Sequence, residues 1–286
     1  MSQISAALVM KLRKISGQWM MDCKKALIET NGDLDEAMAV LRKKGLATLA
    51  KRAARETTEG KVVCKKSDDE KKAAMAMLCC ETDFVSKSDD FVTAAKLLAD
   101  CSLLAQGTEG PQAILETEIQ EKKFSEILTE TISRTGEKME VGDFTRYEID
   151  GTGLIGTYVH FNDKLGTMVE FETSGDEVSC ALAQTATDIA MHITAINPVA
   201  IDSDSIDPDT IEKEKAIAAE QVKNKPANII DKIVEGKLNK FFKEHCLLNQ
   251  PFVKDDSKTV GCALEEAARQ AGGEAKIKRF IRMQIG

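Results

Sequence analysis

The sequence predicts an α+β protein, and three observations lead to that prediction. Apolar residues recur at helical spacing through the first 45 residues. Two short β-type runs meet at a polar turn near residue 70, and a longer strand-rich stretch covers 139–173. Two highly charged helical runs follow, separated by Pro226. We therefore expect a small three-helix module, a two-part α+β core with antiparallel sheets, and an inserted antiparallel coiled-coil hairpin.

The three-helix module comes first. Gly17 ends the first helix, Asn31-Gly32 ends the second, and Asp33 with Glu36 forms a capping box for the third, which we expect to end before Gly45. The apolar stripe of the first helix consists of Ile4, Leu8, Leu12 and Ile15. A module this small has a marginal core of its own.

A basic stretch at 42–55 connects the module to the rest of the chain, and it has two interpretations. Its charges are Arg42, Lys43, Lys44, Lys51, Arg52 and Arg55. Such a run is usually a solvated face, but it also suits contact with phosphates. The alternative function that we keep from the residues alone is therefore an RNA- or ribosome-binding protein that uses 42–55.

The core begins with two antiparallel strands, Lys61–Lys66 and Ala73–Cys80. Helices are expected at 89–106, 111–117 and 121–135. A meander of the strands 139–150, 153–161 and 167–173 should follow, with turns at Asp150-Gly151 and Asn162-Asp163, and then a helix at 177–194.

The inserted hairpin should consist of helices at about 208–223 and 226–244, whose apolar residues can face each other. A strand at 251–254, a helix at 260–271 and a strand at 275–285 should close the core, the last strand rejoining the interrupted sheet. The chain then divides into a helical module at 1–55, the first half of the core at 56–138, the first part of its second half at 139–194, the hairpin at 195–244 and the closing part at 245–286.

Composition excludes several classes of protein. The 286 residues carry a net charge of −8, with a surplus of +7 confined to residues 1–66, so the chain is not coated for nucleic acid along its length. Eight scattered cysteines favour reduced thiols in a reducing cytosol. Neither a signal-like apolar run at the amino terminus nor an apolar run of membrane-spanning length is present in the sequence, so we expect a cytoplasmic protein without membrane contact.

A catalytic centre is not evident. Gly151–Gly156 matches the letters of a dinucleotide-binding loop, but a strand follows it where that loop requires a helix, so an oxidoreductase is disfavoured. The three histidines, at 160, 192 and 245, are not spaced as zinc ligands. His192 lies on an apolar helix face, as a satisfied core histidine would. We expect no enzyme activity, no cofactor and no metal site.

The most informative stretch is the corner between the strand ending at Cys80 and the helix starting near Asp89. Phe84 lies there beside Asp83, among charged and hydroxyl residues. Phe84 could fold back onto its own core, as most phenylalanines do. Alternatively, a corner lies at the surface, and an aromatic beside a carboxylate suits a probe that fills an apolar slot and perturbs a charged site.

The residues at this corner resemble a known family. Thr82-Asp83-Phe84-Val85 after a cysteine-containing strand is similar to the signature of bacterial elongation factor Ts, the guanine-nucleotide exchange factor of elongation factor Tu. Trp19 departs from the small residue that is usual in the family. Further similar stretches are MMDCKKAL at 20–27, AMHI at 190–193, VEGK at 234–237, QPFV at 250–253 and SKTVG at 257–261.

The resemblance implies a fold and a mechanism. The helical module would be ubiquitin-associated-like, and Thr82, Asp83, Phe84 and Val85 would bind elongation factor Tu. Phe84 would enter a slot between helices of the partner, and the intrusion would dislocate the magnesium ion beside GDP, after which GTP loads. Position in the family suggests Leu12, Met20, Met21 and His160 as further contacts. The hairpin suits self-association, as a homodimer or a 2:2 complex, and no direct contact with nucleic acid is implied.

Overall fold

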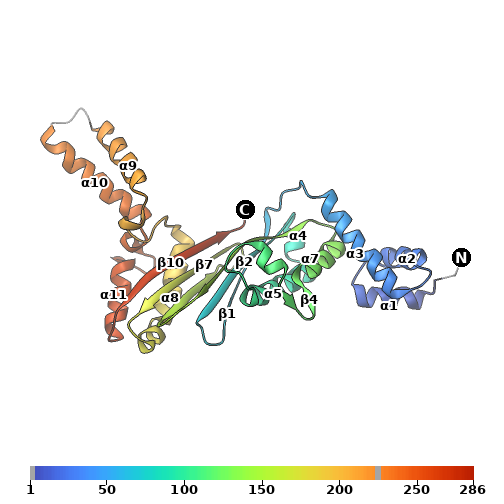
Figure 1. Cartoon of the computed structure of the whole chain (residues 1–286). Helices are drawn as coiled ribbons and strands as arrows, with labels where there is room; N and C mark the ends of the chain where they lie inside the picture. Colours follow the sequence, from blue (N-terminus) through green and yellow to red (C-terminus); the bar gives the residue numbers. More distant parts are fainter. Residues whose placement is uncertain (1–3, 223–226) are drawn as a thin grey trace.

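The computed structural model describes residues 4–222 and 227–286. The molecule is elongated, with the helical module at one end, two sheets in the middle and a helical arm projecting near the other end (Figure 1). Mixed helices and antiparallel sheets confirm the α+β prediction. None of the described helices combines the length and the apolar character needed to cross a membrane.

The helical module consists of α1 (Ala6–Ser16), α2 (Met20–Glu29) and α3 (Leu34–Lys51). Ser5 caps α1, and Gly17 ends it in the left-handed conformation, with a φ of 67°. The buried apolar residues of the module are Val9, Leu12, Cys23, Ala26, Leu27, Ala37 and Leu41.

The third helix does not end before Gly45, and that prediction is wrong. α3 continues to Lys51 and packs along α7 (Phe124–Thr135) of the core. A Cβ atom on Gly45 would lie 2.7 Å from the carbonyl oxygen of Thr129. Gly45 therefore permits a close approach between two helices rather than a helix end.

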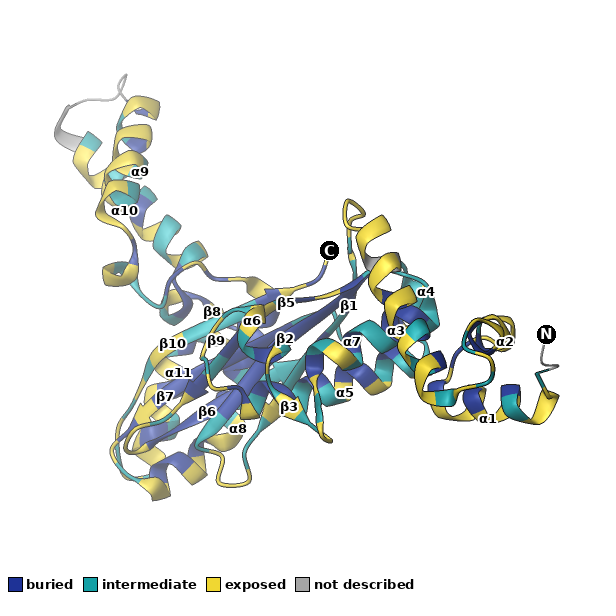
Figure 2. Cartoon of the chain, turned by 45° about the vertical axis from the view of Figure 1, so that its right-hand side comes forward, coloured by how far each residue is buried: buried dark blue, intermediate teal, exposed yellow. Residues whose placement is uncertain are grey.

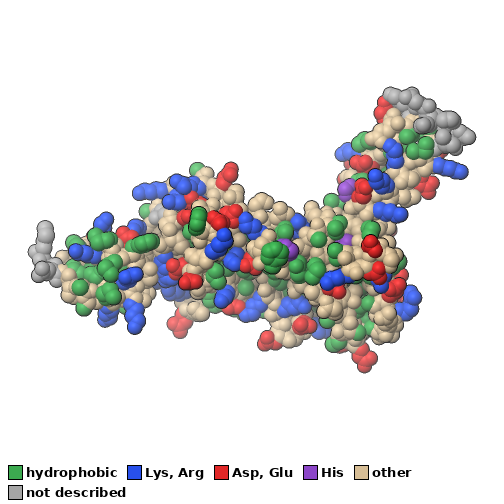
Figure 3. Space-filling view, turned by 180° about the vertical axis from the view of Figure 1, so that it is seen from behind, with side chains coloured by type: hydrophobic (Ala, Val, Ile, Leu, Met, Phe, Trp, Pro, Cys, Tyr) green, Lys and Arg blue, Asp and Glu red, His purple; other side chains and the backbone are tan. Residues whose placement is uncertain are grey.

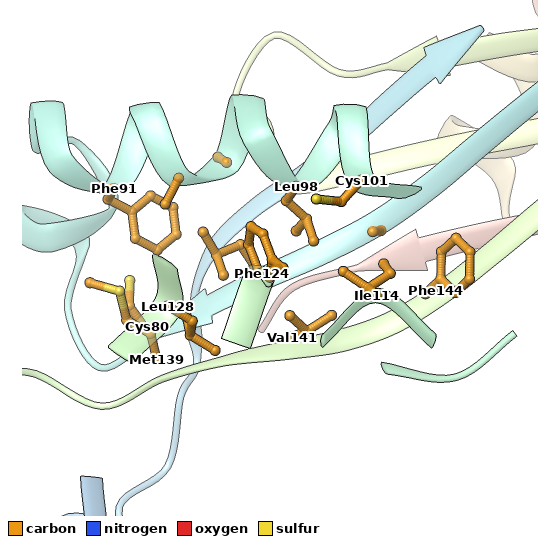
Figure 4. Close-up of a cluster of buried hydrophobic side chains, with 14 of the residues drawn as sticks. Cys80, Phe91, Leu98, Cys101, Ile114, Phe124, Leu128, Met139, Val141 and Phe144 are labelled. Atoms are coloured by element: carbon orange, nitrogen blue, oxygen red, sulfur yellow. The ribbon is translucent and has the colours of Figure 1, made fainter. Parts of the chain in front are cut away.

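The first sheet has the strand order β1-β2-β5, from β1 (Glu59–Lys66), β2 (Lys72–Cys80) and β5 (Met139–Glu148). Both pairings are antiparallel. The short helix α4 (Asp83–Ser86) follows β2, and α5 (Asp89–Leu104), α6 (Pro111–Leu115) and α7 cover one face, where Phe91, Leu98 and Phe124 pack on the sheet (Figure 4). A small hairpin of β3 (Glu118–Ile119) and β4 (Lys122–Lys123) precedes α7.

Strand β2 is buried on both faces. Its even residues, such as Leu78 and Cys80, face the helices, whereas its odd residues, such as Met75 and Cys79, face the second sheet. Burial on both sides explains the uninterrupted apolar run in the sequence. The adjacent cysteines therefore pack in different cores, and burial raises the pKa of Cys79 to about 11 and of Cys80 to about 12.

The second sheet has the order β10-β7-β6, from β6 (Gly153–Val159), β7 (Leu165–Thr173) and β10 (Ala275–Gln284). Helices α8 (Asp176–Ile196) and α11 (Val260–Gln270) pack on its outer face. The prediction that the last strand rejoins the interrupted sheet is confirmed. The buried faces of the two sheets meet in a shared core (Figure 2).

The prediction of one meander over 139–173 is wrong, because β5 pairs with β2 and only β6 and β7 pair with each other. Alternating apolar residues show which face of a strand is buried but not which strand lies beside it. Gly151, with a φ of 109°, instead turns the chain from the first sheet to the second. The domain boundaries stay predictions.

The arm consists of α9 (Pro208–Gln221) and α10 (Ala227–His245), which lie side by side (Figures 1 and 2). Asp207 caps α9, and Ala218, Val222 and Leu238 are buried along the arm. The predicted break at Lys225-Pro226 lies outside the described residues. Short 3-10 turns at Ser203–Ser205 and Leu247–Asn249 flank the arm, and the predicted strand at 251–254 is a small hairpin of β8 (Pro251–Phe252) and β9 (Asp255–Thr259).

Candidate functional site

The corner after β2 is a single turn of helix capped at both ends. Thr82 is the N-cap of α4, and its Oγ1 accepts a hydrogen bond from the backbone N–H of Val85 at 3.4 Å. Two residues after α4, Ser88 caps α5 in the same way by accepting from Phe91 N at 3.3 Å. Consecutive caps make the chain turn twice within a short segment, and Phe84 lies on the outer side of this turn.

Phe84 lies at the tip of this corner and is 83% exposed. The interpretation that it folds back onto the core is therefore wrong in this structure. Val85 instead packs on the core between the first sheet and its helices, and Ser86 is buried. An exposed phenylalanine followed by two inward-facing neighbours is held outward by its backbone and can contact a second molecule.

Asp83 is ionised beside Phe84. Lys87 Nζ lies 2.7 Å from Asp83 Oδ2, and this hydrogen bond lowers the pKa of the Asp83 carboxyl. Both side chains are largely exposed, so the pair adds little to stability. The tip therefore presents an apolar ring next to a carboxylate that keeps its charge at neutral pH.

Glu137 holds the base of the corner. Its carboxylate accepts hydrogen bonds from Thr82 N at 3.2 Å and from Thr82 Oγ1 at 2.9 Å. Thr82 therefore donates to Glu137 through its hydroxyl proton while the same oxygen caps α4. These bonds attach the corner to the segment that enters β5, at the opposite edge of the sheet from β1.

His160 lies in the turn between β6 and β7, half-buried, with its Nδ1 at 3.1 Å from the hydroxyl oxygen of Tyr158. The ring of the next residue, Phe161, lies 4.3 Å from the imidazole centroid and is 88% exposed. Phe161 was not singled out in the sequence, because the pattern placed it inside a strand that in fact ends at Val159. The turn residues Asn162-Asp163 directly after it could have indicated that Phe161 lies in the turn.

The structure brings this turn and the corner to the same strand. Val62 N donates to Asp163 O at 2.6 Å, and Lys164 Nζ lies 2.7 Å from Glu59 Oε2 at the start of β1. Glu59 is opposite Cys80 in the register, and α4 also lies against β1. Two exposed phenylalanines therefore flank β1: Phe84 on α4, after the first sheet's β2, and Phe161 in the turn between β6 and β7 of the second sheet.

The predicted contacts in the helical module differ in exposure. Met20 and Met21 are exposed, beside exposed Trp19, at the start of α2. Leu12 is fully buried in the core of the module, so in this structure it cannot contact a partner directly. Hydrophobic side chains gather on the helical module in Figure 3.

His192 is a buried core histidine, as predicted. Its Nδ1 accepts from Val253 N at 3.3 Å and its Nε2 lies 2.9 Å from Gln250 Oε1, which indicates a neutral ring with the proton on Nε2. Burial lowers its pKa, and the Gln250 bond only partly opposes this. Among the described residues no group of three or more acidic, cysteine or histidine side chains is arranged to hold a metal ion.

Comparison with known proteins identifies the family. The family model described as "Elongation factor TS" matches residues 81–286. The chain is 42% identical to elongation factor Ts of a Nitratiruptor species, over 99% of this chain and 93% of that protein. It is 40% identical to those of Clostridium botulinum (strain Alaska E43 / Type E3), with the same coverage, and of Prosthecochloris aestuarii (strain DSM 271 / SK 413), over the full length of both chains. This chain therefore belongs to the elongation factor Ts family.

Proposed function

We propose that this protein is a translation elongation factor that binds elongation factor Tu in its GDP form and promotes release of the nucleotide. The observation that carries the proposal is the outward-held Phe84 beside ionised Asp83, on a corner capped at both ends, in a chain of this family. Exchange needs no acid, base or nucleophile, so the function is that of a binding protein rather than an enzyme.

The mechanism is a wedge combined with an electrostatic disturbance. Phe84 enters an apolar slot in the nucleotide-binding domain of the partner, and Asp83 brings a negative charge toward the magnesium site. The bound magnesium ion is the largest local charge near the GDP phosphates, so its dislocation weakens GDP binding. Thr82 and Val85 do not insert; they keep the corner in shape.

Thermodynamic linkage relates the binding of the factor to the release of GDP. A factor that binds the nucleotide-free partner more tightly than the GDP-bound partner weakens GDP binding by the same factor. GTP then binds the emptied site and displaces the exchange factor. The proposal thus requires differential binding and no covalent step.

Further contacts extend from the corner along both parts of the molecule. Met20 and Met21 supply an exposed apolar surface on the helical module, and His160 with Phe161 supplies another beside β1. Leu12 is not part of this surface, because it is buried. We propose self-association through the arm of α9 and α10, as a homodimer or a 2:2 complex with the partner.

The test is the release of fluorescent GDP from elongation factor Tu. The protein should accelerate release, and the double variant Asp83→Ala, Phe84→Ala should lose at least about 30-fold, because a buried interface anchor contributes about 2 kcal/mol or more. Leu104→Ala, at another exposed apolar position, on α5, is the matched control and should keep full activity. No acceleration, or full activity of the double variant, would reject the proposal.

A further inference from the structure

The last two arginines of the basic stretch at 42–55, Arg52 and Arg55, bind the carboxylate of Glu81, next to the corner. Glu81, the residue before Thr82, has a side chain that is only 8% exposed. Arg52 Nη1 donates to both of its oxygens at 2.8 Å, and Arg55 Nη1 donates at 3.0 Å. The backbone N–H of Lys138 adds a fourth bond at 2.7 Å.

This cluster differs from the surface ion pairs of the molecule. A buried carboxylate that loses its cations is left as an uncompensated charge, which costs far more than loss of an exposed pair. Burial raises the pKa of the Glu81 carboxyl, but the bonds from Arg52, Lys138 N and Arg55 lower it more, so its pKa falls below the ordinary value. Both of these arginines of the basic stretch therefore have a carboxylate partner within the chain.

A second link joins the helical module to the other end of the corner. Arg134 on α7 donates from Nε to Ser16 O at 2.9 Å and from Nη1 to Asp90 Oδ1 at 3.2 Å. Its own carbonyl oxygen accepts from Trp19 Nε1 at 3.0 Å. Gly17, between α1 and α2, has a φ of 67°, which favours glycine, and it lies against the side chain of Arg134.

Hydrogen bonds thus connect the helical module to the chain on both sides of the corner. Glu81 and Asp90 enclose residues 82–85 in the chain, and each accepts bonds from arginines that contact or belong to the module. The contacts cross long stretches of sequence, since Arg52 and Glu81 are 29 residues apart and Trp19 and Arg134 are 115 apart.

We propose that Arg52, Arg55 and Arg134 are positioning residues that set the orientation of Phe84 relative to the helical module. When the module docks on the partner, these links place the corner at the depth and angle at which Phe84 and Asp83 act. The inference rests on the proposed exchange function and adds a role for the helical module. Besides binding the partner, the module fixes the position of the corner.

The experiment compares two double variants that remove the same charge from the same stretch. Arg52→Gln, Arg55→Gln breaks the Glu81 cluster, whereas Lys43→Gln, Lys51→Gln removes two exposed charges of the same stretch. Three quantities are measured for each variant: the maximal rate of GDP release at saturating factor, the half-saturating concentration, and amide hydrogen exchange of residues 82–86 in the free protein.

The arginine variant should lower the maximal rate about tenfold or more, because small misplacements of an acting group are costly, with a smaller change in half-saturation. Exchange of the amides at 82–86 should accelerate by a similar factor. Glu81→Gln should have the same effect, and the triple variant should be no worse than the arginine pair, since one cluster is removed in each case. Arg52→Lys, Arg55→Lys keeps the charges and should recover most of the rate.

Each contrary result has a distinct meaning. Equal losses in the lysine and arginine variants, confined to half-saturation, would show that the stretch only attracts the partner and would overturn the inference. Unchanged amide exchange in the arginine variant would overturn it as well. If the wild-type protein does not accelerate GDP release, the proposed function fails, and amide exchange still decides whether the arginines hold the corner.

Discussion

Two exposed phenylalanines flank β1, and they are presented in different ways. Phe84 lies on a helical turn that Thr82 caps locally and that the carboxylate of Glu137, 55 residues further along the chain, anchors. Phe161 lies in a strand-to-strand turn held by local bonds, such as Asp163 N to His160 O at 2.8 Å and Lys164 N to Asn162 Oδ1 at 3.0 Å. This turn is also tied to β1, by Val62 N to Asp163 O and by the Lys164–Glu59 ion pair, but no bond joins it to the helical module among those that the described residues make. Their exposure is almost the same.

Exposure alone therefore does not distinguish a probe from a supporting contact; charge and anchoring do. Phe84 has an ionised carboxylate as its neighbour and a connection to the helical module, whereas Phe161 has the aromatic neighbours Tyr158 and His160. We infer that Phe84 changes the state of the partner and that Phe161 contributes binding area. The following predictions test that difference.

The largest expected difference is between the two alanine variants. Phe84→Ala should lower the maximal rate of GDP release by about 30-fold, the effect of an anchor worth about 2 kcal/mol. Phe161→Ala should raise the half-saturating concentration by about fivefold, as for a contact worth about 1 kcal/mol, and leave the maximal rate unchanged. Titration of fluorescent GDP release with each variant separates the two quantities. If Phe161→Ala lowered the maximal rate as strongly, the distinction would be lost.

A smaller effect should follow from removal of one anchor at each site. Thr82→Val keeps the shape but removes the cap of α4 and a donor to Glu137, at a cost of about 1 kcal/mol in local stability. Asn162→Ala, the matched change in the other turn, removes one exposed hydrogen bond and should cost about half as much or less. Amide exchange at Val85 and at Lys164 measures each opening. Equal costs would mean that the corner is no better anchored than the turn.

The smallest expected effect is the pH dependence of the corner, which should appear only in acid. Because the folded-state pKa of Glu81 is depressed, its contribution to stability is present above its ordinary value and is lost as pH falls through the depressed value. Amide protection at 82–86 should therefore stay constant from about pH 7 to 5 and fall below about pH 4. Glu81→Gln should remove this part of the acid response, while the turn at 160–164 serves as an internal control. Loss of protection between about pH 7 and 5 would assign the effect to another group.

Local patterns in the sequence predict the kinds of element and the place of the corner. Helical spacing, capping boxes and alternating strands are local patterns, so α1, α2, the start of α3, β1, β2, α5, α8 and the final strand lie close to where they were predicted. A corner between β2 and α5 also followed locally, because a strand that ends before a capped helix must turn at the surface, but the residues alone left open whether Phe84 faces the core or the solvent.

Which of these elements pack against each other follows from contacts between residues far apart in the chain. β5 pairs with β2 and not with β6, and Gly45 lies where α3 contacts α7. Leu12, which the family resemblance suggested as a partner contact, is buried, and Phe161 is exposed just beyond the end of β6. The basic stretch at 42–55, ambiguous as a run of charges, supplied the arginines for Glu81. Each of these outcomes depends on contacts between residues far apart in the chain, and local periodicity carries no information about such partners.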